Sequence, residues 1–507
     1  MDLDDAGRYG ALRARDPRFD GVFFVGVRTT GIYCRPICPA RLPKRDHCTF
    51  FRTAAEAERE GYRACLRCRP ELAPGESSVD ARSRLAGQAV DRIQTGYLND
   101  HGVAELAAEL GVSSRHLRRV LRTELGVTPV ELAQTHRLAV AKQLLQDTAM
   151  PVSRVAFASG FSSIRRFNAV FSQRFSRPPS SIRRGSSRPA SREGGDETIA
   201  VRLDYRPPLA WRPLLRFLER RATPGIESVG AGAYRRFVST DDGRGGWVEA
   251  APLPDRASLR ASVPVVLADE LPTIVAGLRR LFDLDARPDV VSDHLSRDPD
   301  LVPSIAENPG LRVPGAYDGF ELAVRTILGQ QITVEAASAL CGRFVEEFGQ
   351  GSGETKGARG DGQENSEPSA EGRCFPRPCA IASLSSDDVG ELGMPRARAA
   401  AIVRLARAMT EGDLELHPTS DPAETARRLR SIPGIGPWTV QYILIRALRW
   451  PNAFPSGDLG IRRALGDVTA AEAKKRSLIW EPWRAYAAFH LWNRPLPGVS
   501  YDERPGD

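Results

Sequence analysis

The chain has 507 residues, 41% of them hydrophobic, with a net charge of +8 at pH 7. This is too long for one ordinary core, so we expect roughly two to four domains. No apolar run approaches the roughly eighteen residues of a membrane span, and the start MDLDDAGRYG is acidic and polar. We therefore expect neither a membrane span nor a signal peptide, and place the protein in the cytoplasm.

Two short-spaced cysteine pairs lie near the N-terminus. Cys34 and Cys38 occur in GIYCRPICPAR, and Cys65 and Cys68 in GYRACLRCRPE. Zinc prefers four tetrahedral ligands, and two such pairs supply four thiolates to one ion. The spacing alone leaves open a purely structural role, because most four-cysteine zinc sites are structural. The sequence therefore predicts one bound Zn²⁺.

Arginines lie inside or beside both cysteine pairs. Four thiolates around a divalent ion carry a formal charge of about −2, so neighbouring guanidinium groups favour deprotonated, nucleophilic sulfur. The same guanidinium groups are suited to binding a DNA phosphate through paired hydrogen bonds. The residues expected to make such contacts are Arg35, Arg41 and Arg67.

The segments VRTTGIYCRPICPAR and GYRACLRCRPE resemble the N-terminal domain of the Ada methylation-response proteins. The resemblance implies that residues 1–78 form a small zinc domain with Cys38, Cys65 and Cys68 as co-ligands. In that family the cysteine matching Cys34 irreversibly accepts a methyl group from a DNA methylphosphotriester while bound to zinc. Methylation removes one negative charge, which is expected to tighten DNA binding.

The positive charge is concentrated in residues 81–185, which hold sixteen Lys and Arg against seven Asp and Glu. The rest of the chain is close to neutral. A basic segment of this length inside a balanced protein is the electrostatic footprint of DNA binding. On charge alone, a solvated basic face is the alternative.

Two copies of a helix-turn-helix pattern occur in this basic segment. VAELAAELGVSSRHLRRVLRTELG turns at Gly111 and starts its second helix at Ser114, and PVSRVAFASGFSSIRRFNAVFSQRFS turns at Gly160. A helical stretch around 130–146 joins them. Residues 81–184 resemble the AraC-type DNA-binding domain, which implies two recognition helices in successive major grooves. The residues expected to contact DNA are Arg115, Arg118, Arg119, Arg165 and Arg166.

The following segments predict a linker and two more domains. Residues 185–197 are rich in Ser, Arg and Gly, which is typical of a flexible linker. Residues 198–300 contain several short alternating segments and an amphipathic helix, which predict an α+β domain with a small antiparallel sheet. Residues 301–500 are mostly helical in pattern. The polar stretch 351–373 interrupts them and is expected to be a disordered insertion.

A glycine turn and a carboxylate mark the candidate catalytic region. In LRSIPGIGPWTV, Gly434 and Gly436 expose backbone N–H groups at a helix start, where a DNA phosphate can bind. Thr439 is a further candidate DNA contact, and the turn is also a candidate position for a monovalent or divalent cation. Any helical hairpin can use Gly-x-Gly. Asp458, in the loop PSGD at the next helix start, is equally suited to capping that helix.

The hairpin, Asp458 and EPWRAYAAFHLW together resemble the helix-hairpin-helix DNA glycosylases, in particular the AlkA 3-methyladenine DNA glycosylases, over about 198–495. The resemblance makes Asp458 the catalytic carboxylate, which stabilises the oxocarbenium-like sugar and helps to position water. Lyase-competent relatives carry a lysine where this chain has Trp438, which implies hydrolysis to an abasic site without strand cleavage. No C-terminal cysteine cluster is present for an iron–sulfur centre.

An aromatic pocket for a flipped, electron-poor alkylated base follows from the same resemblance. Each of its residues could instead be ordinary core. Where the best-known AlkA sequence has an apolar wedge, after the Gln of LGQ, this chain has Gln331, which can still intercalate or hydrogen-bond the orphan base. The expected pocket residues are Phe217, Trp438, Tyr442 and Trp483.

The sequence thus predicts a multidomain chain, partly α+β and mostly α. It would combine a small zinc domain, a double helix-turn-helix domain, a small antiparallel-sheet domain and an all-α helix-hairpin-helix glycosylase domain. The expected partners are alkylated and promoter double-stranded DNA, with RNA polymerase as the activator target, and the expected state is a monomer. One alternative is a regulator whose C-terminal half binds damaged DNA without catalysis. Another is a repair enzyme whose N-terminal half only tethers it to DNA.

Overall fold

The fold class expected from the sequence is confirmed in the computed structural model: a multidomain, mostly helical protein with a separate antiparallel sheet. The expected linker 185–197 and nearly all of the expected insertion 351–373 lie outside the described residues. No helix in the described part of the chain is long and apolar enough to cross a membrane. The described residues are 3–75, 84–148, 150–182, 198–240, 242–351 and 372–494.

The N-terminal segment forms a four-stranded sheet with the order β3-β1-β2-β4. The β2 and β4 strands are parallel, with Tyr33 opposite Ala64. Because Cys34 and Cys65 directly follow these two residues, the pairing brings the two cysteine pairs to one end of the sheet. The elements are β1 (Phe24–Val27), β2 (Ile32–Cys34), β3 (Cys48–Phe51) and β4 (Arg63–Ala64), flanked by α1 (Asp5–Ala14) and α2 (Ala54–Arg59).

The basic segment forms two helix-turn-helix units joined by one long helix, α7. Gly111 and Gly160 adopt φ values of +68° and +81° at the two turns, a conformation that favours glycine. Ser113 and Ser163 then cap the second helix of each unit. The helices are α3 (Arg84–Gln94), α4 (Tyr97–Asp100), α5 (Val103–Glu109), α6 (Ser114–Leu125), α7 (Pro129–Asp147), α8 (Val152–Ala158), α9 (Ile164–Phe175) and α10 (Pro179–Ile182).

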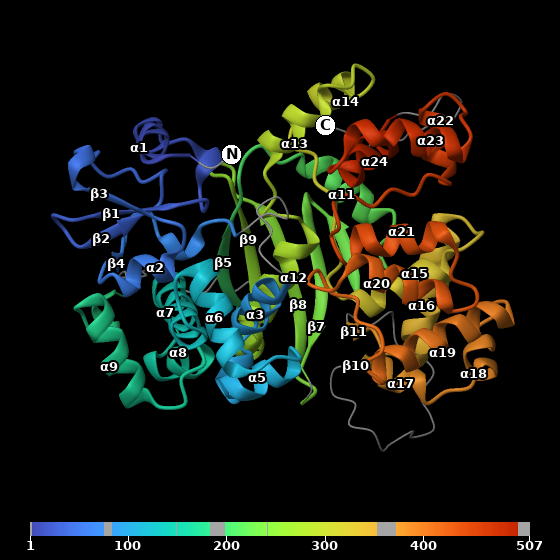
Figure 1. Ribbon diagram of the computed structural model, residues 1–507. Coiled ribbons are helices and arrows are strands. Elements are labelled where there is room, and N and C mark those ends of the chain that lie inside the picture. The colour runs from blue at the N-terminus through green and yellow to red at the C-terminus, as the bar shows by residue number, and fades with distance from the viewer. Residues whose placement is uncertain are drawn as a thin grey trace.

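A five-stranded antiparallel sheet with the order β5-β9-β8-β7-β6 forms the centre of the molecule (Figure 1). Helix α11 is amphipathic, and Leu214, Leu215 and Leu218 bury its apolar face. The elements of this part are β5 (Thr198–Asp204), α11 (Trp211–Glu219), β6 (Glu227–Gly230), β7 (Ala233–Ser239), β8 (Gly245–Pro252), β9 (Ser258–Pro264), α12 (Leu271–Leu281), α13 (Pro288–Leu295) and α14 (Val302–Glu307).

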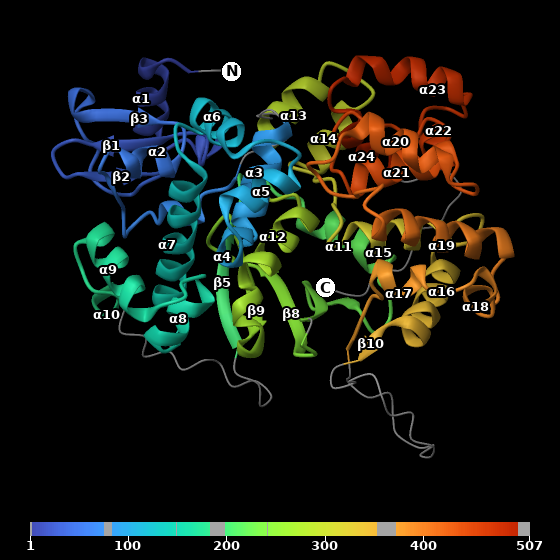
Figure 2. The ribbon, with the colours of Figure 1, turned by 60° about the horizontal axis from the view of Figure 1, so that its bottom comes forward.

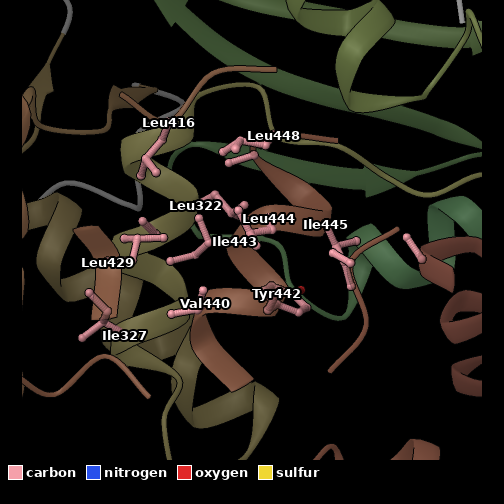
Figure 3. Close-up of a cluster of buried hydrophobic side chains, with 14 of the residues drawn as sticks. Leu322, Ile327, Leu416, Leu429, Val440, Tyr442, Ile443, Leu444, Ile445 and Leu448 are labelled. Carbon is pink, nitrogen blue, oxygen red and sulfur yellow. The ribbon is translucent and has the colours of Figure 1, made fainter. Parts of the chain in front are cut away.

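The C-terminal part is helical and is built around α21. Figure 3 shows Val440 and Ile443 of α21 among Leu322 and Ile327 of α15 and Leu429 of α20, all of them buried. The elements are α15 (Gly319–Leu328), α16 (Val334–Phe348), β10 (Gln350–Gly351), β11 (Arg373–Cys374), α17 (Pro378–Ala382), α18 (Ser386–Gly390), α19 (Arg396–Thr410), α20 (Pro422–Ser431), α21 (Pro437–Arg446), α22 (Leu459–Ala464), α23 (Ala470–Arg476) and α24 (Arg484–Trp492).

The N-terminal segment with the four cysteines (residues 3–75, here called the zinc-binding segment) and the helix-turn-helix helices lie on one side of the central sheet. The C-terminal helices lie on the other side (Figures 1 and 2). One buried apolar cluster continues from the N-terminal sheet through α7–α9 into the central sheet. Ion pairs also join the N-terminal segment to α7: Arg69 pairs with Asp147 at 2.6 Å, and Lys142 pairs with Glu71 at 2.8 Å. The zinc-binding segment is therefore packed against both neighbouring parts.

Candidate functional sites

Asp458 lies at the start of α22 with its carboxylate between two tryptophans. Its Oδ1 accepts a hydrogen bond from the backbone N–H of Ile461 at 2.9 Å and so caps the helix. The indole N–H of Trp492 also donates to Oδ1 at 2.9 Å, and the indole N–H of Trp438 donates to Oδ2 at 2.8 Å. The carboxylate is half-buried. Three donors therefore fix its position while solvent still reaches it.

A continuous run of aromatic rings leads away from this carboxylate. Trp438 and Tyr442 lie on one face of α21 and stack with ring centroids 5.1 Å apart and planes 14° apart. The run continues from Tyr442 to Trp492, then to Phe489 and then to Phe217. The distances between successive ring centroids are 6.1, 5.5 and 4.8 Å. Three of the four expected pocket residues are thus brought together from α11 and α21.

The fourth, Trp483, lies at the opposite end of α24 from Trp492. It is 4% exposed, and its ring packs edge-on against Tyr486 at 5.8 Å. The structure does not bring it to Asp458. Sequence reasoning missed Trp492, although EPWRAYAAFHLW carries a tryptophan near each end. Only the path of α24 past α22 shows which indole reaches the carboxylate.

Two arginines back the aromatic run. The Arg446 guanidinium lies over Phe217 at 4.9 Å and over Tyr442 at 5.5 Å, and it donates to the Tyr442 hydroxyl at 2.7 Å. Arg221 lies over Phe217 at 3.8 Å. Burial by itself raises the pKa of Tyr442, but these two positive charges prevail and lower it below its ordinary value. The contacts of Arg446 with the ring and with the hydroxyl of Tyr442 together hold the phenol ring in a fixed plane.

The hairpin turn is locked from behind by Gln330. Its Nε2 donates to the carbonyl of Gly434 at 3.0 Å and to Oγ1 of Thr439 at 3.1 Å. Gly434 is exposed with a φ of +96°, and Gly436 precedes α21 as its half-buried cap. Thr439 is only 3% exposed. The Thr439 hydroxyl therefore faces Gln330, and the expected contact of Thr439 with DNA stays a prediction.

Gln331 follows on the tip of the loop between α15 and α16. It is exposed and has a φ of +58°, which is uncommon for a residue other than glycine. The next side chain, Ile332, is 39% exposed. The loop thus presents a polar and an apolar side chain beside the hairpin turn.

The four cysteines of the N-terminal segment converge on one point. Their Sγ atoms all lie within 4.8 Å of one another, which fits one tetrahedral zinc ion with Zn–S bonds of about 2.3 Å. Cys38, Cys65 and Cys68 are buried, whereas Cys34 is half-exposed. Of the four cysteines, the one predicted to react is therefore the most exposed as a residue.

Arg35 was expected to contact a DNA phosphate, and the structure corrects this. Its side chain is 1% exposed. The guanidinium donates to Asp20 at 2.8 Å, to Asp204 of the central sheet at 2.7 Å and to the carbonyl of Cys68 at 3.2 Å. The Arg35 guanidinium is therefore out of reach of a phosphate at the surface, because it is buried and already paired with two carboxylates. Arg41 and Arg67 remain exposed.

An Asp204→Asn variant is expected to lower the free energy of unfolding by about 3 kcal/mol at neutral pH, because it leaves Arg35 with one fewer buried partner. Burial by itself raises the pKa of Asp204, but Arg35 and Arg202 prevail and lower it below its ordinary value. The stabilisation is therefore present at neutral pH and lost as the pH falls through that lowered pKa, below about pH 4. Urea denaturation of wild type and variant at neutral pH measures the loss of stability. The same comparison below about pH 4 tests whether the difference between them disappears. Asp255→Asn, at an exposed site in the same domain, should change stability by less than about 0.5 kcal/mol.

Both helix-turn-helix units present arginines to solvent. Arg115, Arg118 and Arg119 are exposed on α6, and Arg165 and Arg166 are exposed on α9. The α6 side chains line an open depression of about 550 Å³. All five residues expected to contact DNA are therefore accessible.

Models of four domain families match the chain. They are the metal binding domain of Ada over residues 7–71, a helix-turn-helix domain over 106–185, the AlkA N-terminal domain over 200–318 and the HhH-GPD superfamily base excision DNA repair protein over 324–484. A "probable bifunctional transcriptional activator/DNA repair enzyme AlkA" of Mycobacterium tuberculosis is 38% identical over 498 residues, covering 96% of both chains. The chain belongs to this bifunctional AlkA family.

Two relatives of different length match separate parts of the chain. The DNA-3-methyladenine glycosylase 2 of Escherichia coli is 33% identical over 290 residues, covering 57% of this chain and 95% of its own. The bifunctional transcriptional activator/DNA repair enzyme Ada of the same species is 35% identical over 147 residues, covering 29% of this chain and 39% of its own. The resemblances drawn from the sequence motifs are confirmed.

Proposed function

We propose that this protein senses DNA alkylation through its zinc domain, activates transcription through its helix-turn-helix units and excises alkylated purines such as 3-methyladenine with its C-terminal half. The observation that carries the glycosylase part is the Asp458 carboxylate, held between Trp438 and Trp492 at the end of an aromatic run. A helix cap alone needs no indole partners. This geometry instead supports a carboxylate aimed at a substrate.

The chemistry follows from charge. N-alkylation makes a purine cationic and weakens its glycosidic bond, so a flipped base can stack on Trp438 and Tyr442 without many hydrogen bonds. The bond from the sugar carbon to the base nitrogen breaks, and its electron pair leaves with the base. The Asp458 carboxylate stabilises the positive sugar until water adds to that carbon. Because Trp438 stands where Schiff-base chemistry would need a lysine, the product is an intact strand with an abasic site.

DNA is gripped beside this site by the hairpin turn. Gly434 and Gly436 keep the start of α21 open, and the first N–H groups of a helix lack intrahelical partners. We propose that these groups bind a phosphate and that Gln331 enters the duplex where the base leaves. A cation at this turn stays a prediction.

We propose that the methyl-acceptor step uses the sulfur of Cys34, the one partly exposed cysteine of the four. The sulfur attacks the methyl carbon of a methylphosphotriester, the methyl–oxygen bond breaks, and the phosphodiester leaves with the electron pair. Zinc, when bound, keeps the sulfur deprotonated at neutral pH. The reaction consumes the site, so one methyl group is taken up per chain.

We propose that methylated protein binds promoter DNA more tightly and recruits RNA polymerase, acting as a cytoplasmic, nucleoid-associated monomer. The exposed arginines of α6 and α9 support DNA binding by both helix-turn-helix units. Loss of one negative charge next to DNA raises affinity without any new contact.

Two measurements on wild-type protein separate this proposal from its alternatives. The first is release of free methylated purines from alkylated duplex DNA. Binding without release would favour a regulator whose C-terminal half only recognises damage. The second is affinity for one promoter before and after methyl transfer. Equal affinities would favour a repair enzyme whose N-terminal half is only a tether.

A Trp492→Phe variant tests the aromatic site, because it keeps the ring and removes the indole N–H donated to Asp458. Losing one hydrogen bond to a charged group is expected to lower kcat/KM for base release by about 10- to 100-fold. Trp480→Phe is the matched control, since Trp480 donates in the same way to Asp298 at 2.7 Å, outside the aromatic run. It should lower the melting temperature and leave base release unchanged. Equal activity of the two variants would contradict the role of Trp492.

A further inference from the structure

A cavity of about 640 Å³ lies where the zinc-binding segment meets the second helix-turn-helix unit. Cys34 and two of its co-ligands line one part of it. Phe175, Arg177 and Ile182, from the end of α9 to the end of α10, line another part. The surroundings of the acceptor sulfur are therefore completed by a segment more than a hundred residues away in the chain.

The charge of this cavity is strongly one-sided. Within the part of the chain that the structure describes, six arginines line it and no aspartate or glutamate does. Among the described residues none of the six pairs with a carboxylate, and Arg15 donates only to backbone carbonyl groups. Six positive charges exceed the roughly two negative charges of a zinc ion with four thiolates. The lining arginines are Arg13, Arg15, Arg41, Arg63, Arg67 and Arg177.

Other arginines close to this cavity do have carboxylate partners. The buried arginines nearby, Arg35 and Arg69, are satisfied by carboxylates. The arginines of the cavity are left for a ligand, and a group of guanidinium forks around a nucleophile suits phosphate oxygens. A DNA strand supplies several phosphates in a row, one of them the methylated and neutral triester.

The second helix-turn-helix unit is fixed to the strand that carries Cys34. Arg174, one residue before the end of α9, pairs with Glu58 at 2.6 Å. Glu58 also accepts hydrogen bonds from Thr135 of α7 at 2.5 Å and from Tyr33 at 3.0 Å. Tyr33 directly precedes Cys34 in β2. This network, 9% exposed at Glu58, holds the end of α9 in a constant position relative to the acceptor.

Building on the methyl-acceptor function, we propose that Arg177 is a binding residue of the methylphosphotriester site, so that the helix-turn-helix domain supplies part of the acceptor site. Its guanidinium holds an oxygen of the reacting phosphate. During transfer the sulfur–methyl bond forms, the methyl–oxygen bond breaks, and the electron pair stays on that phosphate, which changes from neutral to −1. Arg177 therefore binds the transition state more tightly than the neutral substrate.

The test uses the full-length, zinc-loaded protein and a short single-stranded oligonucleotide with one methylphosphotriester and no promoter sequence. An Arg177→Ala variant is expected to transfer the methyl group about 10- to 100-fold more slowly than wild type. Binding of the same oligonucleotide without the methyl group, followed by anisotropy over a range of salt, should show a slope of log K against log salt reduced by about 0.7. Arg177→Lys, which keeps the charge, should recover most of the slope and part of the rate.

Arg154→Ala is the matched control, because Arg154 is an exposed arginine of α8 that does not line the cavity. It should match wild type in rate, zinc content and melting temperature. Transfer by wild type together with an unchanged rate and salt slope in Arg177→Ala would overturn the role of Arg177 alone. So would a slow Arg177→Ala variant that has lost zinc and is not improved by lysine. Absence of transfer by wild type would overturn the acceptor function and this proposal with it.

Discussion

An Asp458→Asn variant is expected to release methylated purines from alkylated DNA at least about 100-fold more slowly than wild-type protein. The amide is nearly isosteric with the carboxylate, but it carries no negative charge to oppose the positive sugar, and loss of one preorganised electrostatic contact costs roughly that factor or more. Folding should survive, because asparagine caps a helix about as well as aspartate. The Ile461 N–H therefore keeps its acceptor.

The measurement is chromatographic detection of free 3-methyladenine under single-turnover conditions, with DNA affinity determined in parallel. Asp467→Asn is a suitable control, because Asp467 is exposed, lies nine residues further on and has a φ of +57°, which asparagine tolerates. Release by Asp458→Asn at the rate of this control would remove Asp458 from the mechanism. A variant that binds DNA normally and releases no base is the outcome that supports it.

A Cys34→Ala variant is expected to take up no methyl group from a methylphosphotriester, where wild-type protein takes up one per chain. The expected loss is complete, because the sulfur is a reactant that no neighbouring atom replaces. The variant should also lack the rise in promoter affinity that follows methylation. Both results are read from transfer of a labelled methyl group and from promoter binding before and after incubation with damaged DNA.

Removing a ligand can also release zinc, and two further variants separate the effects. Cys34→His keeps four ligands, since zinc accepts three cysteines and one histidine, and should retain metal while taking up no methyl group. Cys48→Ser changes a cysteine outside the four-sulfur cluster and should behave as wild type. Methyl uptake by Cys34→His would show that another atom is the acceptor.

Both chain neighbours of Cys34 are anchored to other parts of the molecule. Tyr33 reaches Glu58 and through it Arg174 of α9, whereas Arg35 reaches Asp204 of the central sheet. The residue before Cys34 is therefore connected to the helix-turn-helix helices, and the residue after it is connected to the central sheet of the repair half. The Asp204→Asn variant reports on the second of these connections.

Local patterns in the chain were enough to predict much of this organisation. The cysteine spacing identified the metal site, because four ligands in two short pairs need only one strand pairing to meet. The helical apolar spacing and the glycine turns identified the two helix-turn-helix units, because both depend on a few neighbouring residues. The loop PSGD placed Asp458 at a helix start for the same reason.

Contacts between distant segments could not be predicted in this way. Arg35 and Arg41 look alike beside the cysteines, yet only the docking of the central sheet buries Arg35 against Asp204. Trp483 and Trp492 stand in one motif, yet the packing of α24 on α22 decides which indole reaches Asp458. The sequence by itself determined which chemistry the chain carries, since reactive residue types and short spacings are local. The tertiary structure decided which copies of those residues serve it, because burial and charge pairing depend on segments that only folding brings together.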